Sequence, residues 1–135
     1  MTDMAVDADC LADCVKVWKG ELKYILCNLN SDNTAIVTVK TSTDANYDNF
    51  LAESASDQCL WALYHLQWKN ASGVSKTRIV LYTWTPDDAK IKRKLVFSAA
   101  RGSFQTKLTN SAVTHYALVA TESSDLALNN VTAKL

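Results

Sequence analysis

The stretch that decides the fold covers residues 75–108 and reads SKTRIVLYTWTPDDAKIKRKLVFSAARGSFQTKL. Its first part, residues 76–84, is rich in β-branched and aromatic side chains and predicts a strand. The sequence TPDD at 85–88 is turn-forming, and a threonine three residues before an acid is typical of a helix start. A long helix is expected next, because apolar residues recur at helical spacing, namely Ile91, Leu95, Ala99 and Leu108.

The residues before this stretch predict two helices and three strands. Apolar side chains at spacings of three and four indicate helices at 9–18 and 43–53, with Thr43 as the N-cap of the second. Runs rich in β-branched and aromatic residues predict strands at 23–29, 34–40 and 59–69. Polar, turn-forming residues separate the first strand from the second, and the third from the strand at 76–84. We therefore expect two antiparallel hairpins.

After the long helix, residues 115–120 predict one more strand and residues 122–134 predict a closing helix. The order of elements is then αββαββαβα, without an internal repeat. Strands mixed with helices that can cover both faces predict an α/β or α+β sandwich around one sheet.

The composition agrees with one compact domain over residues 1–135. Of the 135 residues 48% are hydrophobic, and only three are glycine and one is proline, which leaves no flexible linker or disordered arm. The longest apolar runs are far shorter than the roughly 20 residues of a membrane span. Residues 1–10 have neither the basic start nor the apolar core of a secretory signal. We therefore expect a cytoplasmic protein that does not span a membrane.

The charges are unevenly distributed along the chain. The formal net charge is zero, with 14 basic and 14 acidic residues. Residues 76–107 alone contain eight basic and two acidic residues, so this segment carries +6 and the remainder −6. A local basic field of this kind attracts an acidic protein surface, an anionic lipid or a nucleic acid.

Enzymatic and metal-dependent functions have little support in the sequence. Both histidines, His65 and His115, lie in predicted strands with no nucleophile motif around them, and no glycine-rich phosphate-binding motif is present. The cysteines lack C-x-x-C spacing and are expected to act as small core residues: Cys10, Cys14, Cys27 and Cys59. We therefore expect no catalytic residue, no cofactor and no bound metal.

The stretch 75–108 resembles the signature region of the ADF/cofilin family. That signature has a basic strand, then W-x-P-D, then a helix with the pattern K-x-K-M-x-Y-A-S-S-K-D-A. Here Trp84, Pro86 and Asp87 stand directly before the basic helix. The resemblance implies a single ADF-homology domain of the α/β class, in which helices sandwich a central mixed sheet of about five strands. It also implies a monomeric, non-enzymatic protein of the actin cytoskeleton that binds actin monomers and filament sides and promotes depolymerisation and severing.

The same resemblance implies two actin-binding surfaces. The first, for monomers and filaments, would comprise the N-terminal leader and the long helix, with Leu95 in place of the family's methionine: Met4, Ala5, Val6, Lys92, Lys94, Leu95 and Arg101. The second, for a neighbouring protomer of the filament, would comprise Lys76, Arg78 and Lys134. Gly102 replaces the family's aspartate in the second half of the long helix. Asn129 and Asn130, in the closing helix, stand where filament-binding relatives are often charged, which predicts weaker filament than monomer binding. Thr2 takes the place of the family's phosphorylated serine.

Two alternatives remain open at this stage. Relatives with the same fold, of the coactosin and glia maturation factor types, bind filaments or the actin-related-protein nucleation complex without severing. The basic segment also suits a phosphoinositide head group, through Lys90, Lys92, Arg93, Lys94 and Arg101. Nucleic acid is not favoured, because stacking needs exposed rings and Phe97 and Phe104 are expected in the core.

Overall fold

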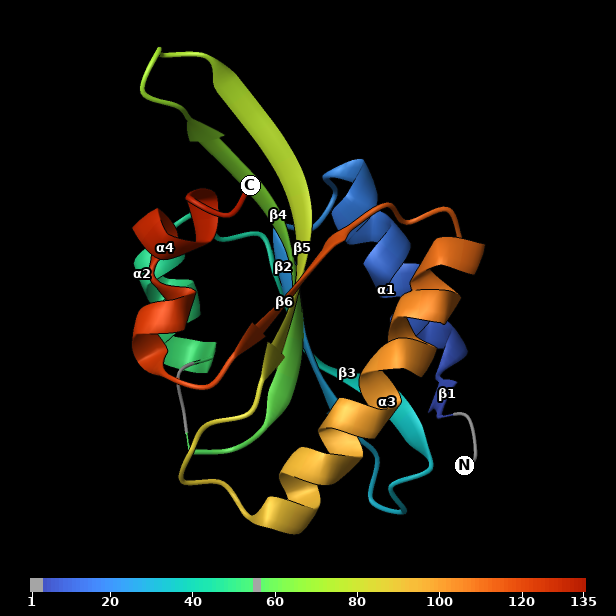
Figure 1. The fold of residues 1–135 in the computed structure, drawn as a ribbon. Helices are drawn as coiled ribbons and strands as arrows, with labels where there is room; N and C mark the ends of the chain where they lie inside the picture. Colours follow the sequence, from blue (N-terminus) through green and yellow to red (C-terminus); the bar gives the residue numbers. More distant parts are fainter. Residues whose placement is uncertain (1–3, 55–56) are drawn as a thin grey trace.

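The computed structural model describes residues 4–54 and 57–135, and its centre is a six-stranded mixed sheet with helices on both faces (Figure 1). The strands are β1 (Ala5–Val6), β2 (Tyr24–Leu29), β3 (Ala35–Ser42), β4 (Leu60–Lys69), β5 (Ser75–Trp84) and β6 (Tyr116–Ala120). The helices are α1 (Ala8–Lys19), α2 (Tyr47–Ser54), α3 (Ile91–Asn110) and α4 (Leu128–Thr132), with a 3-10 turn, η1, at Ser123–Leu126. The α/β class and the sandwich of helices around one sheet are confirmed. No helix in the described part of the chain is long and apolar enough to cross a membrane.

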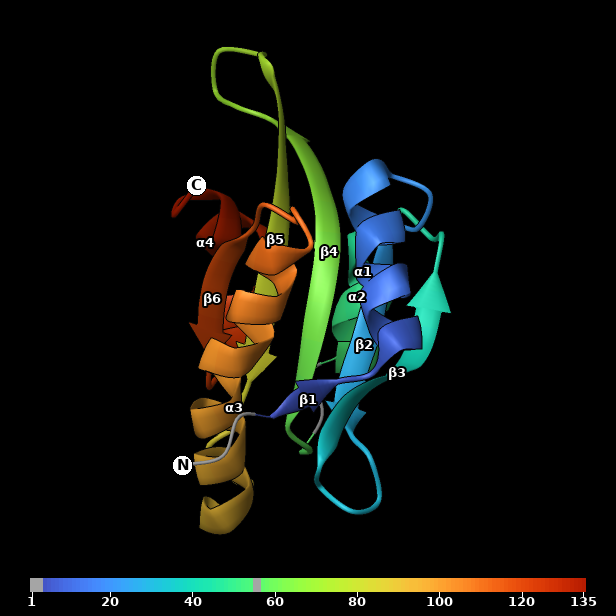
Figure 2. The same cartoon turned by 90° about the vertical axis from the view of Figure 1, so that its right-hand side faces the viewer.

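The sheet has the strand order β1-β3-β2-β4-β5-β6. The two expected hairpins, β2–β3 and β4–β5, are antiparallel, whereas β1 and β6 pair in parallel with β3 and β5. Helices α1 and α3 cover one face, and α2 and α4 cover the other, as the turned view in Figure 2 also shows. The strand alternation directs odd and even positions of β4 and β5 to opposite faces, so the sheet has a separate core on each side.

Four expectations about the elements were wrong in detail. The sheet has six strands, because the two-residue β1 pairs with Ala35 and Ile36 and is too short to show a sequence period. The sequence at 85–88 does not start α3, which begins at Ile91. The backbone of residues 85–88 instead continues beside the end of β6, where Thr85 N donates to Ala120 O at 3.0 Å.

The second helix begins at Tyr47 and not at Thr43, because Asn46 provides the local cap and its Oδ1 accepts from Asp48 N at 2.9 Å. The expected closing helix at 122–134 is divided into η1 and α4. Between them the carbonyl of Leu126 accepts a hydrogen bond from the Tyr47 hydroxyl at 2.7 Å, outside any helical ladder. A local side-chain cap therefore sets the first of these boundaries, and a tertiary contact lies at the second.

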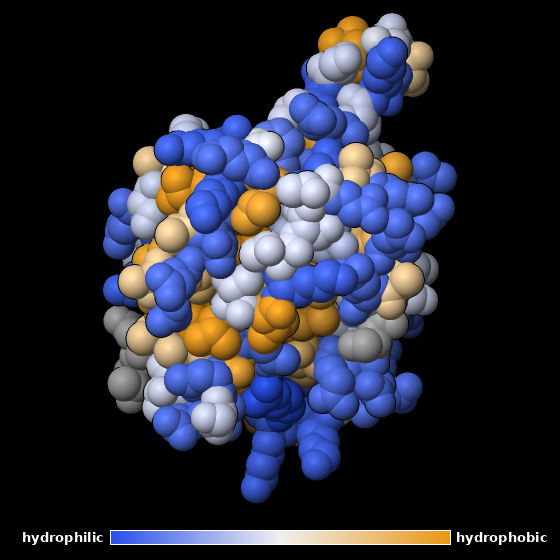
Figure 3. Space-filling view, turned by 180° about the vertical axis from the view of Figure 1, so that it is seen from behind, coloured by the Kyte–Doolittle hydropathy of each residue, from blue (hydrophilic) through white to orange (hydrophobic). Residues whose placement is uncertain are grey.

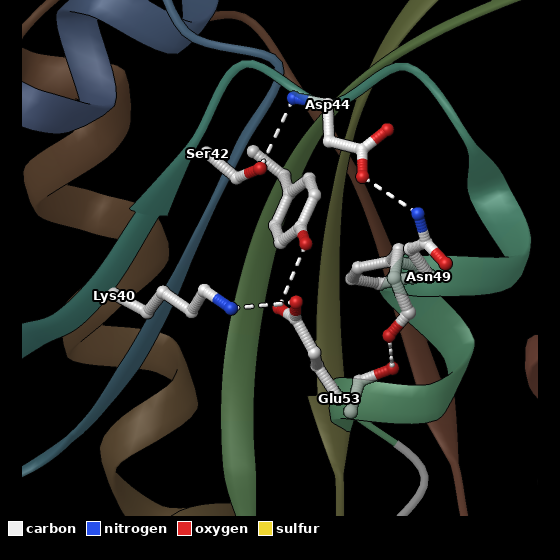
Figure 4. Close-up of polar contacts among 8 residues, drawn as sticks. Lys40, Ser42, Asp44, Asn49 and Glu53 are labelled. Carbon is white, nitrogen blue, oxygen red and sulfur yellow. Dashed lines mark hydrogen bonds and ion pairs between the residues drawn. The ribbon is translucent and has the colours of Figure 1, made fainter.

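Short helices on the α2 side are held by polar contacts as well as by burial. The Tyr24 hydroxyl donates to Glu53 Oε2 at 2.7 Å, and Lys40 Nζ lies 2.6 Å from Glu53 Oε1 (Figure 4). Burial raises the pKa of Tyr47 to about 12, so its hydroxyl stays protonated and able to donate. These bonds join α2 to β2 and β3 and to the C-terminal segment.

Candidate functional site

The long helix α3 buries one side and exposes the other. Its buried residues follow the spacing of one helix face, namely Phe97, Ala100, Phe104 and Leu108, which confirms that both phenylalanines are in the core. The Phe97 ring stacks on Trp61 with centroids 4.0 Å apart. On the opposite side Ile91 and Leu95 are 73% and 64% exposed. The helix thus presents two large apolar side chains to solvent, one turn apart.

The first turn of α3 has an unfavourable charge arrangement. It contains Lys92, Arg93 and Lys94 but no acidic residue, and its N-cap Lys90 makes no side-chain capping bond. A helix N-terminus carries partial positive charge, so basic side chains there are repelled and not stabilised. Among residues 4–54 and 57–135 the only ion pair is Lys40–Glu53, so none of these basic side chains forms an ion pair within that part of the chain. Such a departure from local preference is expected where a surface serves binding.

The three basic residues of that turn differ in what they contact. Lys92 is exposed, and Lys94 is half-buried with its Nζ donating to Asp87 O at 3.1 Å. Arg93 turns inward, where its guanidinium donates to the side chains of Asn28 and Asn33 at 2.8 and 3.0 Å and lies 5.2 Å from the Phe97 ring centroid. Arg93 therefore ties α3 to the β2–β3 hairpin and is not a free cation for a partner.

The N-terminal leader lies against α3. Met4 N donates to Ser103 Oγ at 3.3 Å, and the side chains of Met4 and Val6 pack against the core on this face, while Ala5 is exposed. The structure therefore brings the leader and α3 together, as the resemblance implies. Thr2 lies outside the described residues.

Arg101 is half-buried and lies two turns after Lys94 on the same side of α3. Leu95 thus lies between two flanks of the helix, with Lys92 on one and Lys94 with Arg101 on the other. We call Met4–Val6 together with Lys92, Lys94, Leu95 and Arg101 the helix surface. Its chemistry is an apolar centre with basic neighbours, which suits an acidic protein surface with an apolar pocket.

A second basic surface lies on the β4–β5 hairpin, which projects beyond the sheet (Figures 1 and 3). Within the described residues, β6 pairs with β5 only from Val80 onward and β2 pairs with β4 only as far as Tyr64. The outer part of the hairpin is therefore a two-stranded ribbon. Its loop closes tightly because Gly73 has a φ of +78° and Asn70 Oδ1 accepts from Val74 N at 3.0 Å.

Lys76 and Arg78 are two residues apart on β5, so they share one face of this ribbon. They lie opposite Trp68 and Leu66 of β4. A groove of about 370 Å³ runs from the ribbon to the C-terminus, and its lining comprises Trp68, Asn70, Lys76, Thr77, Arg78, Thr132 and Leu135. Lys134 is exposed at the same C-terminal end. We call Lys76, Arg78 and Lys134 the ribbon surface. Trp68 and Leu135 were not expected here, because an apolar residue outside a family motif does not by itself indicate a binding site.

The two surfaces lie at different ends of the molecule. In Figure 1 the start of α3 is at the bottom and the β4–β5 ribbon is at the top. A partner that covers the beginning of α3 therefore leaves the ribbon free for a second molecule. This separation is the geometry needed to bind two partner subunits at once.

Known proteins are similar to this chain in both sequence and fold. The profile of a family described as "Cofilin/tropomyosin-type actin-binding protein" matches residues 3–135. A cofilin of Mycosarcoma maydis is 36% identical over 104 residues, which are 76% of this chain and 75% of that protein. A cofilin of Schizosaccharomyces pombe is 30% identical over 131 residues, covering 96% and 93% of the two chains. The crystal structure of Streptomyces griseoflavus cofilin superposes with a TM-score of 0.86 at 30% identity, over 97% and 96% of the two chains.

Proposed function

The chain belongs to the cofilin/tropomyosin-type family of actin-binding proteins, and on this premise we propose that it binds actin monomers and filament sides and promotes filament depolymerisation and severing. As a member of this family it is a non-enzymatic actin-binding protein. We place its action in the cytoplasm, on the actin cytoskeleton, as a monomer.

One observation carries the assignment of the primary site. Leu95 is 64% exposed at the start of a helix whose first turn is basic and has no acidic residue of its own. A large apolar side chain exposed in this way gains free energy when a partner buries it, and the lysines beside it attract acidic side chains and set the orientation. We therefore assign actin binding, for monomers and filaments alike, to the helix surface.

The ribbon surface would bind a second actin protomer within a filament. Its charges are exposed, and the groove beside them has an apolar wall from Trp68 and Leu135. Asn129 and Asn130, on α4, leave this end of the molecule with fewer charges. We therefore propose that the protein binds filaments more weakly than monomers.

Two paired substitutions test whether the helix surface and the ribbon surface bind different actin protomers. Lys92→Ala with Lys94→Ala should weaken both monomer binding in a native gel and filament binding in co-sedimentation. Lys76→Ala with Arg78→Ala should weaken only co-sedimentation. Lys16→Ala with Lys19→Ala is the matched control, because it removes the same charge from exposed positions on α1. Equal loss of monomer binding in both test pairs would contradict the two-surface assignment, and no binding of the unsubstituted protein at low salt would contradict actin binding itself.

Severing separates this proposal from the coactosin-like and glia-maturation-factor-like alternatives. Imaging of single filaments over time distinguishes severing, side binding and monomer capture in one experiment. We expect breaks along the filaments after the protein is added. Stable decorated filaments, or an effect confined to branch points, would instead favour one of the alternatives.

A phosphoinositide head group is a second candidate ligand. It is favoured by the basic side chains near the start of α3 that lack an acidic partner among the described residues, Lys90, Lys92 and Lys94, together with Arg101. Arg93 is not included among these head-group ligands, because its guanidinium donates hydrogen bonds to Asn28 and Asn33. Flotation with vesicles that contain phosphoinositide should recover more protein than flotation with neutral vesicles, and equal recovery would remove this candidate.

Phosphorylation at Thr2 would regulate the helix surface, because a phosphate adds about −1.5 to −2 charge beside the leader and repels an acidic partner. The phosphomimetic change Thr2→Glu should weaken monomer binding in the native gel, whereas Thr2→Ala should not. Equal binding by both variants would show that charge at this position has no such effect.

A further inference from the structure

Three of the four cysteines meet in the core between α1 and the sheet. Cys10 and Cys14 lie on α1 and Cys27 lies on β2, and all three side chains are fully buried. The Sγ atoms of Cys10 and Cys27 are 3.7 Å apart. Cys59 belongs to the same core but has no thiol contact among the described residues, so it provides an internal reference.

The thiols around Cys10 favour its reactive form. Interaction with the Cys14 and Cys27 thiols lowers the pKa of Cys10, whereas interaction with Cys10, together with burial, raises the pKa values of Cys14 and Cys27. The cluster therefore favours ionisation of Cys10 over ionisation of its two neighbours. A thiolate is the form that attacks oxidants, whereas an ordinary buried thiol is inert.

The edge of the sheet next to Cys10 is open and irregular. Within the described residues β1 pairs only with Ala35 and Ile36, so the remainder of β3 lacks an outer neighbour. A bulge interrupts the β2–β3 ladder, since Leu26 is opposite Lys40 and Cys27 is opposite Thr38, which leaves the 59%-exposed Val39 without a partner. A groove of about 390 Å³ runs along this edge with Cys10 in its lining.

From this geometry we propose that Cys10 and Cys27 form a peroxide-sensitive disulfide site, in which Cys10 is oxidised first and Cys27 then forms the disulfide with it. The Cys10 thiolate attacks one oxygen of hydrogen peroxide, the O–O bond breaks, and sulfenic acid and hydroxide form. The Cys27 sulfur then attacks the sulfenic sulfur, the S–S bond forms and the S–O bond breaks. The thiol proton leaves with the oxygen, so two thiols and one peroxide give one disulfide and two waters.

Helix geometry selects Cys27 over Cys14 as the second sulfur. Cys10 and Cys14 are four residues apart on α1, where Cβ atoms are about 5–6 Å apart and point in nearly the same direction. A disulfide needs Cβ atoms roughly 3.5–4.5 Å apart with converging directions. Cys27 faces Cys10 from strand β2, and the two Sγ atoms are 3.7 Å apart. The link would join the first turn of α1 to the middle of the sheet.

Peptide mapping of the peroxide-treated full-length chain tests the proposal. The folded protein is treated with hydrogen peroxide, alkylated in denaturant, digested with trypsin without reduction and analysed by mass spectrometry. We expect residues 1–16 linked to residues 24–40, with a loss of about 2 Da relative to the two free peptides. Cys59 should be recovered alkylated.

Three single substitutions identify the sulfurs. The link should persist in Cys14→Ala and be lost in Cys27→Ala, while Cys59→Ala behaves as the unsubstituted protein. Because the unsubstituted protein itself reports the link, a variant that fails to fold does not prevent the test. Recovery of all four thiols in alkylated form after peroxide, a link within residues 1–16, or loss of the link in a folded Cys14→Ala variant would each overturn the assignment.

Discussion

The two helical layers of this molecule pack on the same sheet by different means. The α1/α3 layer depends on apolar burial, with Phe97 stacked on Trp61 and the outer side of α3 left free. The α2/α4 layer consists of short helices, and the tyrosines on this side contact one another and donate hydrogen bonds to Glu53 and to the Leu126 carbonyl. Helices of eight and five residues are too short to be stable alone. The long helix is held by its buried side and by Arg93, so the side that carries Leu95 is available for binding.

The largest expected effect is on the α2 side. Phe50 is fully buried, and its ring contacts those of four tyrosines: Tyr24, Tyr47, Tyr64 and Tyr82. Phe50→Ala should lower the free energy of unfolding by about 3–5 kcal/mol, because it leaves a cavity at the centre of the layer. Urea denaturation measures this loss. A cost below about 1 kcal/mol would mean that the layer repacks freely and that its aromatic cluster is not what holds α2.

The next effect separates binding from stability on α3. Leu95→Ala should reduce actin affinity by on the order of 2 kcal/mol, as for a central residue of an interface. Its free energy of unfolding should change by no more than about 0.5 kcal/mol, because the side chain is mostly exposed. Val39→Ala is the control, as Val39 is similarly exposed on β3. Fluorescence titration of monomeric actin and urea denaturation give the two values, and a large loss of stability would place Leu95 in the core and not in the interface.

A smaller effect is expected where a single hydroxyl joins three elements. Tyr47→Phe removes the bond to the Leu126 carbonyl and leaves the Tyr82 hydroxyl, 2.9 Å away, without that partner. The unfolding free energy should fall by about 1–2 kcal/mol, because buried polar groups are left unsatisfied. Hydrogen exchange should show faster opening of the segment around η1 and α4 than of α3. Equal acceleration in both layers would show that the layers do not open independently.

The smallest effect concerns Glu53. The pKa of Glu53 is lowered, first by the Lys40 ammonium and then by the Tyr24 hydroxyl, so its charged form is favoured by folding. The stabilisation is therefore present at pH values above the unfolded pKa of about 4.5 and is lost as the pH falls through the lower folded pKa. Since the pair is partly exposed, Glu53→Gln should cost no more than about 1 kcal/mol at pH 7 and nothing at pH 2. Urea denaturation at both pH values checks this, and a difference that persists at pH 2 would assign the effect to packing.

Several features of the fold and of the site could be predicted because they are encoded locally. The β4–β5 hairpin has strand alternation and a turn-forming loop, and α3 has a repeated apolar spacing, so both were expected from nearby residues. The family pattern placed Leu95, Lys92 and Lys94 on that helix, and the structure leaves Leu95 and Lys92 exposed. Arg93 could not be distinguished from its neighbours, because its partners Asn28 and Asn33 are some sixty residues away in the chain.

The sequence by itself determined which side of each strand and helix is apolar, and thereby the two cores and the long helix with a basic start. Only the tertiary structure decided which distant residues meet. It placed Met4 beside Ser103, divided the closing segment at Leu126, and brought Cys10 to Cys27. The physical reason is that the periodicity of a segment reflects burial, which follows from the polarity of each residue. A contact between distant residues depends instead on strand register and helix position. Those are set by the packing of the whole chain.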